Sequence, residues 1–175
     1  EVERVLPAVR PQYQNTALDP YPLISALGEN EATAPYHYAP SLIEAIMATP
    51  GQQVGSHTFS HYYCLETGQT AASFSDDLAA AQQLAQANFG LELKSLVFPR
   101  NQFSPTYLEV IAQHGFRSYR SNPDIWFWRA GTRGLLAKAN RLLDHYLPLD
   151  RQTSFSQPTT AGPLVDIPAS RFFRP

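Results

Sequence analysis

The stretch SLVFPRNQFSPTYLEVIAQHGFRSYR, residues 95–120, decides the fold, because a strand, a helix and a second strand can be read along it. Residues 95–98 are a short apolar run of the kind that forms a buried strand. Residues 104–113 predict a helix, because a Ser-Pro pair opens them and a glycine follows closely. Residues 116–120 predict the next strand, so the stretch indicates two parallel strands joined by a crossover helix.

The same alternation extends to both sides of this stretch. Helices are predicted over residues 1–14, 40–47, 75–88 and within 132–147, and strands over residues 21–27, 53–56 and 164–167. Alternating strands and helices indicate an α/β fold with a parallel sheet, either open or closed into a barrel. In barrels of this kind the chemistry lies at the carboxyl ends of the strands.

Two of these helices carry more detailed expectations. In the helix over residues 75–88, Ser75 is the expected N-cap, so Asp76 and Asp77 fall in the first turn, where the helix dipole favours negative charge. That position explains both carboxylates without a role in catalysis. The helix within residues 132–147 is expected to have one apolar face, formed by Leu135, Leu136, Ala139, Leu142 and Leu143.

The composition excludes several classes of protein. The chain has 175 residues and a formal net charge of −2 without a cluster of Lys and Arg, which argues against a nucleic-acid-binding surface. No apolar run approaches the roughly 20 residues that span a membrane. The length suits one domain over residues 1–175. The single cysteine, Cys64, rules out an internal disulfide and is expected to be a small buried residue.

Two histidines, four residues apart, follow the predicted strand over residues 53–56 in the segment VGSHTFSH. One turn of helix or a tight loop would direct the imidazoles of His57 and His61 at one metal ion. Neutral imidazole is the commonest metal ligand, and two histidines leave a site open, which suits catalysis. Exposed or capping histidines can show the same spacing. The position of Arg100 just past the next predicted strand end favours the metal site.

The segment GSHTFSH at residues 55–61, followed by LVFPRNQ at residues 96–102, resembles the polysaccharide deacetylase family, also called the NodB-homology carbohydrate esterases. The family's His-Ser/Thr-x-x-His motif is matched fully, whereas its Arg-x-Pro-x motif keeps Arg100 and lacks the proline that follows; Pro99 precedes the arginine instead. The resemblance implies a distorted (β/α) barrel with fewer than eight strands. The family's first and last motifs have no match, so we expect a partial catalytic domain, incomplete at both ends.

The resemblance also implies roles for individual residues near the metal. His57 and His61 would bind a divalent ion, with zinc favoured and cobalt or nickel as further choices. Arg100 would orient a carboxylate base through a charge-assisted hydrogen bond and would pair with Asp124. Thr58 would hydrogen-bond within the loop and hold the two imidazoles in place.

Two aromatic residues are the expected substrate-binding groups. Phe103 belongs to the arginine motif that lines the family's groove, and Trp126 resembles the tryptophan that walls the acetyl pocket. The cluster Trp126-Phe127-Trp128 is equally typical of a core and of a sugar-stacking surface, so both interpretations stay open.

The implied activity is the metal-dependent removal of N- or O-linked acetyl groups from a sugar or polysaccharide. The third metal ligand and the general base belong to the absent first motif, so we expect this stretch alone to bind metal weakly or not at all and to be inactive. The alternative is a non-catalytic carbohydrate-binding or scaffolding domain on the same fold, which also predicts that the motif is missing. A structural metal site would need four protein ligands, and the sequence offers two.

Overall fold

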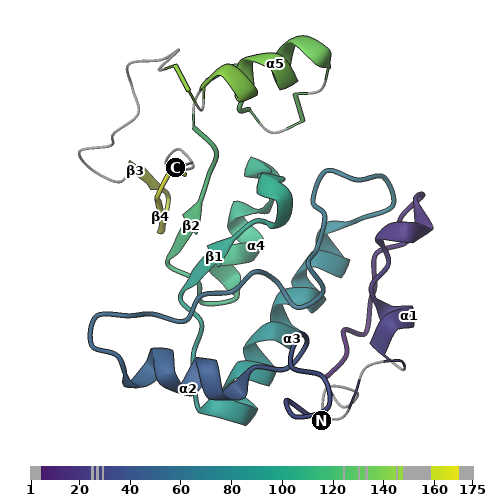
Figure 1. Ribbon diagram of the computed structural model, residues 1–175, viewed down its shortest axis with the longest axis vertical. Helices are drawn as coiled ribbons and strands as arrows, with labels where there is room; N and C mark the ends of the chain where they lie inside the picture. Colours follow the sequence, from purple (N-terminus) through teal and green to yellow (C-terminus); the bar gives the residue numbers. More distant parts are fainter. Residues whose placement is uncertain are drawn as a thin grey trace.

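The computed structural model describes residues 5–24, 26, 28, 30–123, 125–129, 131–132, 134–144, 146–147 and 159–169. These residues contain a mixed sheet of four short strands in the order β1-β2-β4-β3 (Figure 1). The strands are β1 (Ser95–Val97), β2 (Ser118–Arg120), β3 (Thr159–Ala161) and β4 (Leu164–Asp166). The pairs β1–β2 and β2–β4 are parallel, whereas β3 runs antiparallel to β4.

The strand–helix–strand unit predicted over residues 95–120 is confirmed. Leu96 of β1 lies opposite Tyr119 of β2, and α4 (Leu108–Gln113) forms the crossover between the two strands. A 3-10 turn at Pro105–Tyr107 leads into α4. The α/β class is therefore correct. The described strands form an open sheet, so closure into a barrel stays a prediction.

Ser56 places the histidine segment beside β1. Its N–H donates to the carbonyl of Ser95 (2.8 Å), and its carbonyl accepts from the N–H of Val97 (2.9 Å), which makes one parallel bridge opposite Leu96. The predicted strand over residues 53–56 is reduced to this bridge. Because the bridge is parallel, the histidines follow it at the same edge of the sheet at which β1 ends.

Helix α3 (Ala71–Phe89) begins earlier than predicted, because Thr70 and not Ser75 is its N-cap. Thr70 Oγ1 accepts from the N–H of Ser73 (3.1 Å), and Ser73 Oγ accepts from the N–H of Thr70 (3.1 Å), which is a capping box. Asp76 and Asp77 therefore lie in the second turn. The helix-dipole explanation of these carboxylates is wrong, because the dipole acts within the first turn.

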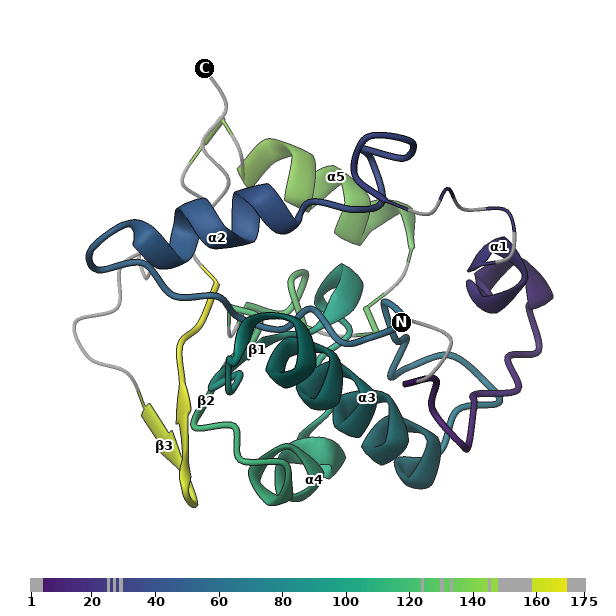
Figure 2. The ribbon, with the colours of Figure 1, turned by 90° about the horizontal axis from the view of Figure 1, so that it is seen from below.

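The hydrophobic core lies between the sheet and the two helices α3 and α4, which Figure 2 shows close together. Its fully buried large side chains are Tyr62, Phe74, Leu78, Leu96, Phe98, Ile111 and Leu164. Cys64 belongs to this core with 2 % of its surface exposed, as expected. Burial raises the pKa of its thiol far above the ordinary range, so the sulfur is held as a neutral group.

Two predictions for the N-terminal part are wrong. Residues 5–14 contain no helix, because Pro7 and Pro11 lack the backbone donors that a helix interior needs; residues 1–4 lie outside the described part. A 3-10 turn at Thr16–Leu18 precedes α1 (Tyr21–Ile24), a short helix where a strand was predicted. Asp19 Oδ1 accepts from the N–H of Tyr21 (3.0 Å) and favours a helical start. Helix α2 (Pro40–Ala48) agrees with its prediction.

Helix α5 (Leu135–Asp144) lies within its predicted range, but its leucines do not form a buried face. Leu135 and Leu136 are 85 % and 70 % exposed, and the two leucines of its last turn are also exposed. Arg141 Nη2 instead donates to the carbonyl of Thr132 (2.8 Å) and fastens the helix to the preceding turn. The predicted apolar face is present on the helix, but it is exposed because α5 lies apart from α3 and α4 (Figure 1).

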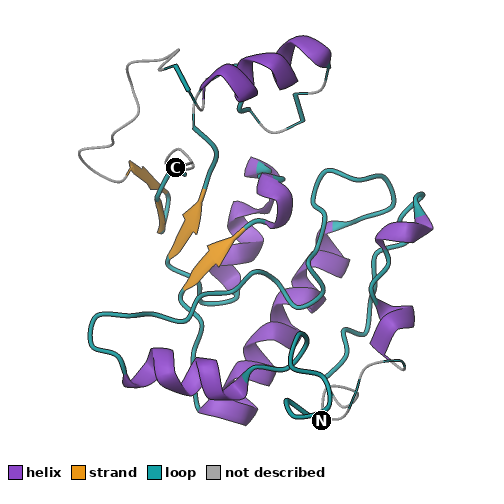
Figure 3. Ribbon diagram, viewed as in Figure 1, coloured by secondary structure: helices purple, strands orange, loops and turns teal. Residues whose placement is uncertain are grey.

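Loops connect most of these short elements (Figure 3), as suits a chain with 15 prolines. None of the helices in the described part of the chain is long and apolar enough to cross a membrane.

Candidate functional site

The two histidines lie next to each other in a tight loop. Their ring centroids are 5.0 Å apart, and the ring planes meet at 66°. Thr58 (φ +65°) and His61 (φ +55°) both adopt left-handed backbone conformations, so the segment is a loop rather than a turn of helix. Each such residue costs about 1–3 kcal/mol, and this strain is typical of functional loops.

Both imidazoles are anchored through the same ring nitrogen. His57 Nδ1 lies 2.9 Å from the carbonyl oxygen of Val97, and His61 Nδ1 lies 3.0 Å from the hydroxyl of Tyr63. A carbonyl oxygen only accepts hydrogen bonds, so Nδ1 of His57 carries the proton and Nε2 has the lone pair. Histidines that bind metals are held in this way, with one nitrogen fixed by a hydrogen bond and the other directed at the ion.

The charge state of His61 also suits metal binding. Burial lowers the pKa of His61 below its usual value, and electrostatic interactions with the neighbouring His57 and Arg100 lower it further. The neutral imidazole, which is the form that binds metals, is therefore favoured.

Side chains within the loop hold its backbone. The N–H of Thr58 donates to Ser56 Oγ (3.0 Å), and Thr58 Oγ1 accepts from the N–H of Tyr62 (2.7 Å). The predicted hydrogen bond of Thr58 within the loop is therefore present. Tyr62 is fully buried, so this bond ties the end of the loop to the core.

A buried carboxylate contacts the middle of the loop from α3. Asp77 accepts from the N–H of Phe59 (2.8 Å), the N–H of Ser60 (3.1 Å) and the Ser60 hydroxyl, and none of its surface is exposed. Burial raises the pKa of Asp77 to about 6, against the opposite effect of these three hydrogen bonds. Asp77 was expected to be a first-turn residue. Its place in the apolar stripe with Phe74, Leu78 and Ala81 was the signal in the sequence that could have identified it.

The ring of Tyr63 lies between Arg100 and His61 and contacts both. The Arg100 guanidinium carbon is 4.9 Å from the centre of the Tyr63 ring, and that ring is 5.1 Å from the ring of His61. Arg100 (φ +51°) and Asn101 (φ +53°) are left-handed, as in the histidine loop. The structure therefore brings the arginine motif to the histidine pair, and Tyr63, which no sequence motif identified, lies between them.

Gln102 joins the arginine loop to the segment that follows the histidines. Its Oε1 accepts from the N–H of Leu65 (3.0 Å), and its Nε2 donates to Glu66 Oε1 (2.8 Å). Asn122 Nδ2 donates to the carbonyl of Asn101 (2.9 Å) on the other side. These contacts fix a loop that lacks the proline expected after the arginine.

The expected substrate-binding residues lie at different places. Phe103 stacks on Tyr119 at 5.4 Å and meets Phe98 edge-on at 5.5 Å, so its ring packs at the edge of the core. Trp126 is 48 % exposed. A hollow of about 290 Å³ joins the arginine loop to the turn at residues 125–129, and Trp128 rather than Trp126 lines it together with Arg100. Asp124 lies outside the described residues.

A larger cavity of about 510 Å³ adjoins the histidine loop. The loop forms one wall, and most of the other lining residues are apolar or aromatic side chains from α1, α2, α3 and their flanks, among them Tyr21, Ile43, Leu84 and Phe89. Such a cavity suits the apolar parts of a small molecule.

Metal ligands beyond the histidine pair are not apparent in the described part of the chain. No group of three or more His, Cys, Asp and Glu side chains is placed there to hold a metal ion. The anchored Nδ1 atoms and the neutral state of His61 nevertheless fit a metal. Such a site would take the two imidazoles as ligands from the described part of the chain and would need further ligands from elsewhere.

The chain matches the model of a known protein family. The family model described as polysaccharide deacetylase matches residues 24–119, which is more than half of the chain. This range includes both histidines and Arg100. No curated protein sequence matches the chain.

Proposed function

The chain belongs to the polysaccharide deacetylase family, and from that premise we propose that it serves the metal-dependent hydrolysis of N- or O-linked acetyl groups on a sugar or polysaccharide. The observation that carries the proposal is the pair His57 and His61, with each Nδ1 anchored and with Arg100 beside them. Family membership supports a hydrolase that acts on acetylated carbohydrate.

His57 and His61 would hold the metal through their Nε2 atoms. When bound, a divalent ion such as zinc supplies Lewis-acid polarisation of the acetyl carbonyl; cobalt and nickel accept the same ligands. Val97 and Tyr63 keep the rings oriented, since they fix Nδ1 of each imidazole.

Arg100 would orient the carboxylate that takes a proton from the attacking water, through a charge-assisted hydrogen bond. The ring of Tyr63 under its guanidinium supports this position by a cation–π contact. Asp124 would be a second partner of Arg100, as the family resemblance implies.

The sugar would lie near the hollow that Arg100 shares with Trp128. Asn101, Gln102 and Asn122 also line this hollow, and amide groups beside an aromatic face suit a sugar ring. Trp126 and Phe103 remain proposed substrate contacts on the strength of the family resemblance. The exposed Trp126 ring would equally serve a non-catalytic carbohydrate-binding domain, which is the second candidate.

The test measures acetate release by the full-length protein, loaded with zinc, from N-acetylated chitin oligosaccharides and from O-acetylated xylan. We expect His57→Ala with His61→Ala to lower the rate by about 100-fold or more and to abolish zinc retention in elemental analysis. His114→Gln, a histidine outside the site, is the control and should stay within about twofold of the wild-type rate.

Undiminished acetate release by the double variant would overturn the proposal. Wild-type protein that binds these oligosaccharides but releases no acetate, with binding unchanged in the double variant, would establish the non-catalytic carbohydrate-binding domain instead.

A further inference from the structure

We propose that Asp77 is a positioning residue that folds the loop of His57 and His61 and so sets the arrangement of the two imidazoles. The inference rests on the proposed function only in that it treats these imidazoles as the working groups of the site. Asp77 belongs to α3, and it lies outside both the histidine motif and the arginine motif of the site.

The carboxylate is fully committed to the loop. Asp77 Oδ1 accepts from the N–H of Phe59 (2.8 Å), and Oδ2 accepts from the N–H of Ser60 (3.1 Å) and from the Ser60 hydroxyl. Asp77 has no exposed surface, and its neighbours Phe74 and Leu78 are fully buried core residues. A carboxylate in such surroundings is costly unless donors meet it, and here all three come from two consecutive loop residues.

The position of these donors links Asp77 to the imidazoles. Phe59 and Ser60 lie between Thr58 and His61, the two left-handed residues that give the loop its shape. Residues other than glycine leave this conformation readily unless the surroundings hold them in it. The contacts of Asp77 hold the two peptide N–H groups between the strained positions, and the imidazoles lie at the two ends of the same five-residue segment.

Neighbouring contacts do not replace this role. Ser56 Oγ and Thr58 Oγ1 act within the loop and fix its two ends. Asp77 holds the middle, and it does so from a helix whose first turn is closed by a capping box. The middle of the loop is therefore hydrogen-bonded to α3 through the side chain of Asp77.

The test compares Asp77→Asn with Asp76→Asn, the adjacent carboxylate on the same turn, which accepts from the N–H of Val9 (2.8 Å) outside the histidine loop. An asparagine keeps the size but replaces one acceptor oxygen with a donor, which opposes the loop N–H groups. The readout is NMR of metal-free protein. It records the ring resonances of His57 and His61 and the nuclear Overhauser contact between protons of the two rings, whose centroids are 5.0 Å apart.

We expect Asp77→Asn to move the ring resonances of both histidines and to remove the contact between them, whereas Asp76→Asn leaves both unchanged. Ser60→Ala deletes one donor in three and should produce a smaller change in the same direction, which covers the case in which Asp77→Asn does not fold. In the full-length protein, with cobalt as the probe, Asp77→Asn should weaken metal binding by about 10-fold or more.

Unchanged ring resonances and an intact ring contact in folded Asp77→Asn, with only a lower unfolding midpoint, would overturn the inference and leave Asp77 as a core residue. The inference is equally overturned if Asp77→Asn does not fold and Ser60→Ala leaves the rings unchanged. Failure of the proposed function has a different signature, because a wild-type protein without deacetylase activity would still show the ring changes in Asp77→Asn.

Discussion

Left-handed backbone outside glycine is concentrated in two loops of this protein. In the described residues it occurs at Thr58 and His61 of the histidine loop and at Arg100 and Asn101 of the arginine loop. At about 1–3 kcal/mol for each residue, this strain persists only where other contacts hold the backbone. Asp77 supplies such contacts to the first loop, and Gln102 and Asn122 supply them to the second.

Tyr63 connects these loops through a single side chain. Its hydroxyl lies 3.0 Å from His61 Nδ1, its ring lies under Arg100, and its N–H donates to the hydroxyl of Tyr13 (2.9 Å). It therefore fixes both the orientation of one proposed metal ligand and the position of the arginine. The ring and the hydroxyl perform separate parts of this task, so they can be tested separately.

Tyr63→Phe removes the hydroxyl and keeps the ring. We expect cobalt affinity to fall by about tenfold, because His61 loses the partner of its Nδ1, while the unfolding midpoint changes little. The measurement is a cobalt titration of the full-length protein followed by visible absorption, with Tyr36→Phe at a fully exposed tyrosine as the control. Equal affinities for the two variants would contradict the role given to the hydroxyl.

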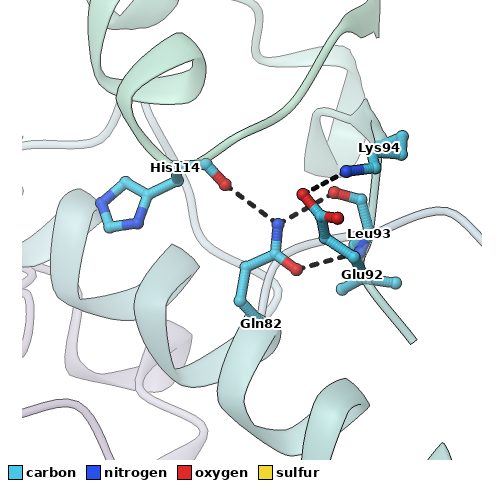
Figure 4. A network of polar contacts seen from close by, with 5 residues as sticks. All are labelled: Gln82, Glu92, Leu93, Lys94 and His114. Carbon is cyan, nitrogen blue, oxygen red and sulfur yellow. Dashed lines mark hydrogen bonds and ion pairs between the residues drawn. The ribbon is translucent and has the colours of Figure 1, made fainter. Parts of the chain in front are cut away.

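At the scale of elements, α3 organises the parts of the chain around it. Gln82, in its middle, donates from Nε2 to the carbonyls of Leu93 (2.9 Å) and His114 (3.0 Å), and its Oε1 accepts from the N–H of Leu93 (2.9 Å). Figure 4 shows this network, with the ion pair of Glu92 and Lys94 beside it. One side chain thus joins α3 to the segment that leads into β1 and to the end of α4.

Gln82→Ala should lower the free energy of unfolding by about 1–3 kcal/mol, because three partly buried backbone groups lose their partner. Urea unfolding followed by circular dichroism measures this change. Gln83→Ala, at the exposed neighbouring position, is the matched control and should change stability by less than about 0.5 kcal/mol. A loss at Gln82 no larger than at Gln83 would show that water replaces these bonds at no cost.

At the scale of the whole molecule, folding is coupled to the protonation of buried groups. His114 Nε2 lies 2.8 Å from the Ser75 hydroxyl, and burial lowers the pKa of His114 below its ordinary 6.5, partly opposed by Asp76. The unfolded chain therefore binds this proton more readily than the folded chain does. The contribution of His114 to the free energy of unfolding must then rise with pH up to about 6.5 and be constant above that value.

His114→Gln removes this titration and keeps a group that can bond to Ser75. We expect the stability of the wild type relative to His114→Gln to be lower at pH 5 than at pH 8, as measured by urea unfolding at both values. Asp77 has the opposite effect, since its raised pKa of about 6 favours the folded state as pH falls. This effect is the same in the wild type and in His114→Gln, so it cancels when the two proteins are compared. A difference that is independent of pH would refute the linkage of His114.

Local patterns in the sequence were sufficient for several elements. The unit over residues 95–120 and helix α2 were predicted from apolar runs, Ser-Pro and Pro starts and a closing glycine, all of which act within a few residues. The start of α3 is predicted at Ser75 and lies at Thr70, although the capping box of Thr70 and Ser73 is equally local. The N-terminal helix failed because two prolines outweighed its apolar spacing.

The histidine pair and Arg100 were identified from the sequence, and the match to the polysaccharide deacetylase family confirms the resemblance that they carry. The roles of Asp124, Trp126 and Phe103 stay predictions. Asp124 and Trp126 match the spacing of their family motif only loosely, and Phe103 belongs to an arginine motif that lacks its proline. Side chains outside a rigid motif take their places from packing. Helix α5 shows the same dependence on packing. Its leucine spacing predicts an apolar face, but the spacing does not determine whether another element covers that face.

By itself, the sequence determined the α/β class, the parallel β1–β2 unit and the two motifs, because each depends on residues close together in the chain. Only the tertiary structure decided how the site is held. Val97 meets His57 across 40 positions, and Asp77 meets Phe59 across 18. Such partners are chosen by the packing of β1 and α3 around one core, and a buried carboxylate is satisfied by whichever donors that packing brings to it.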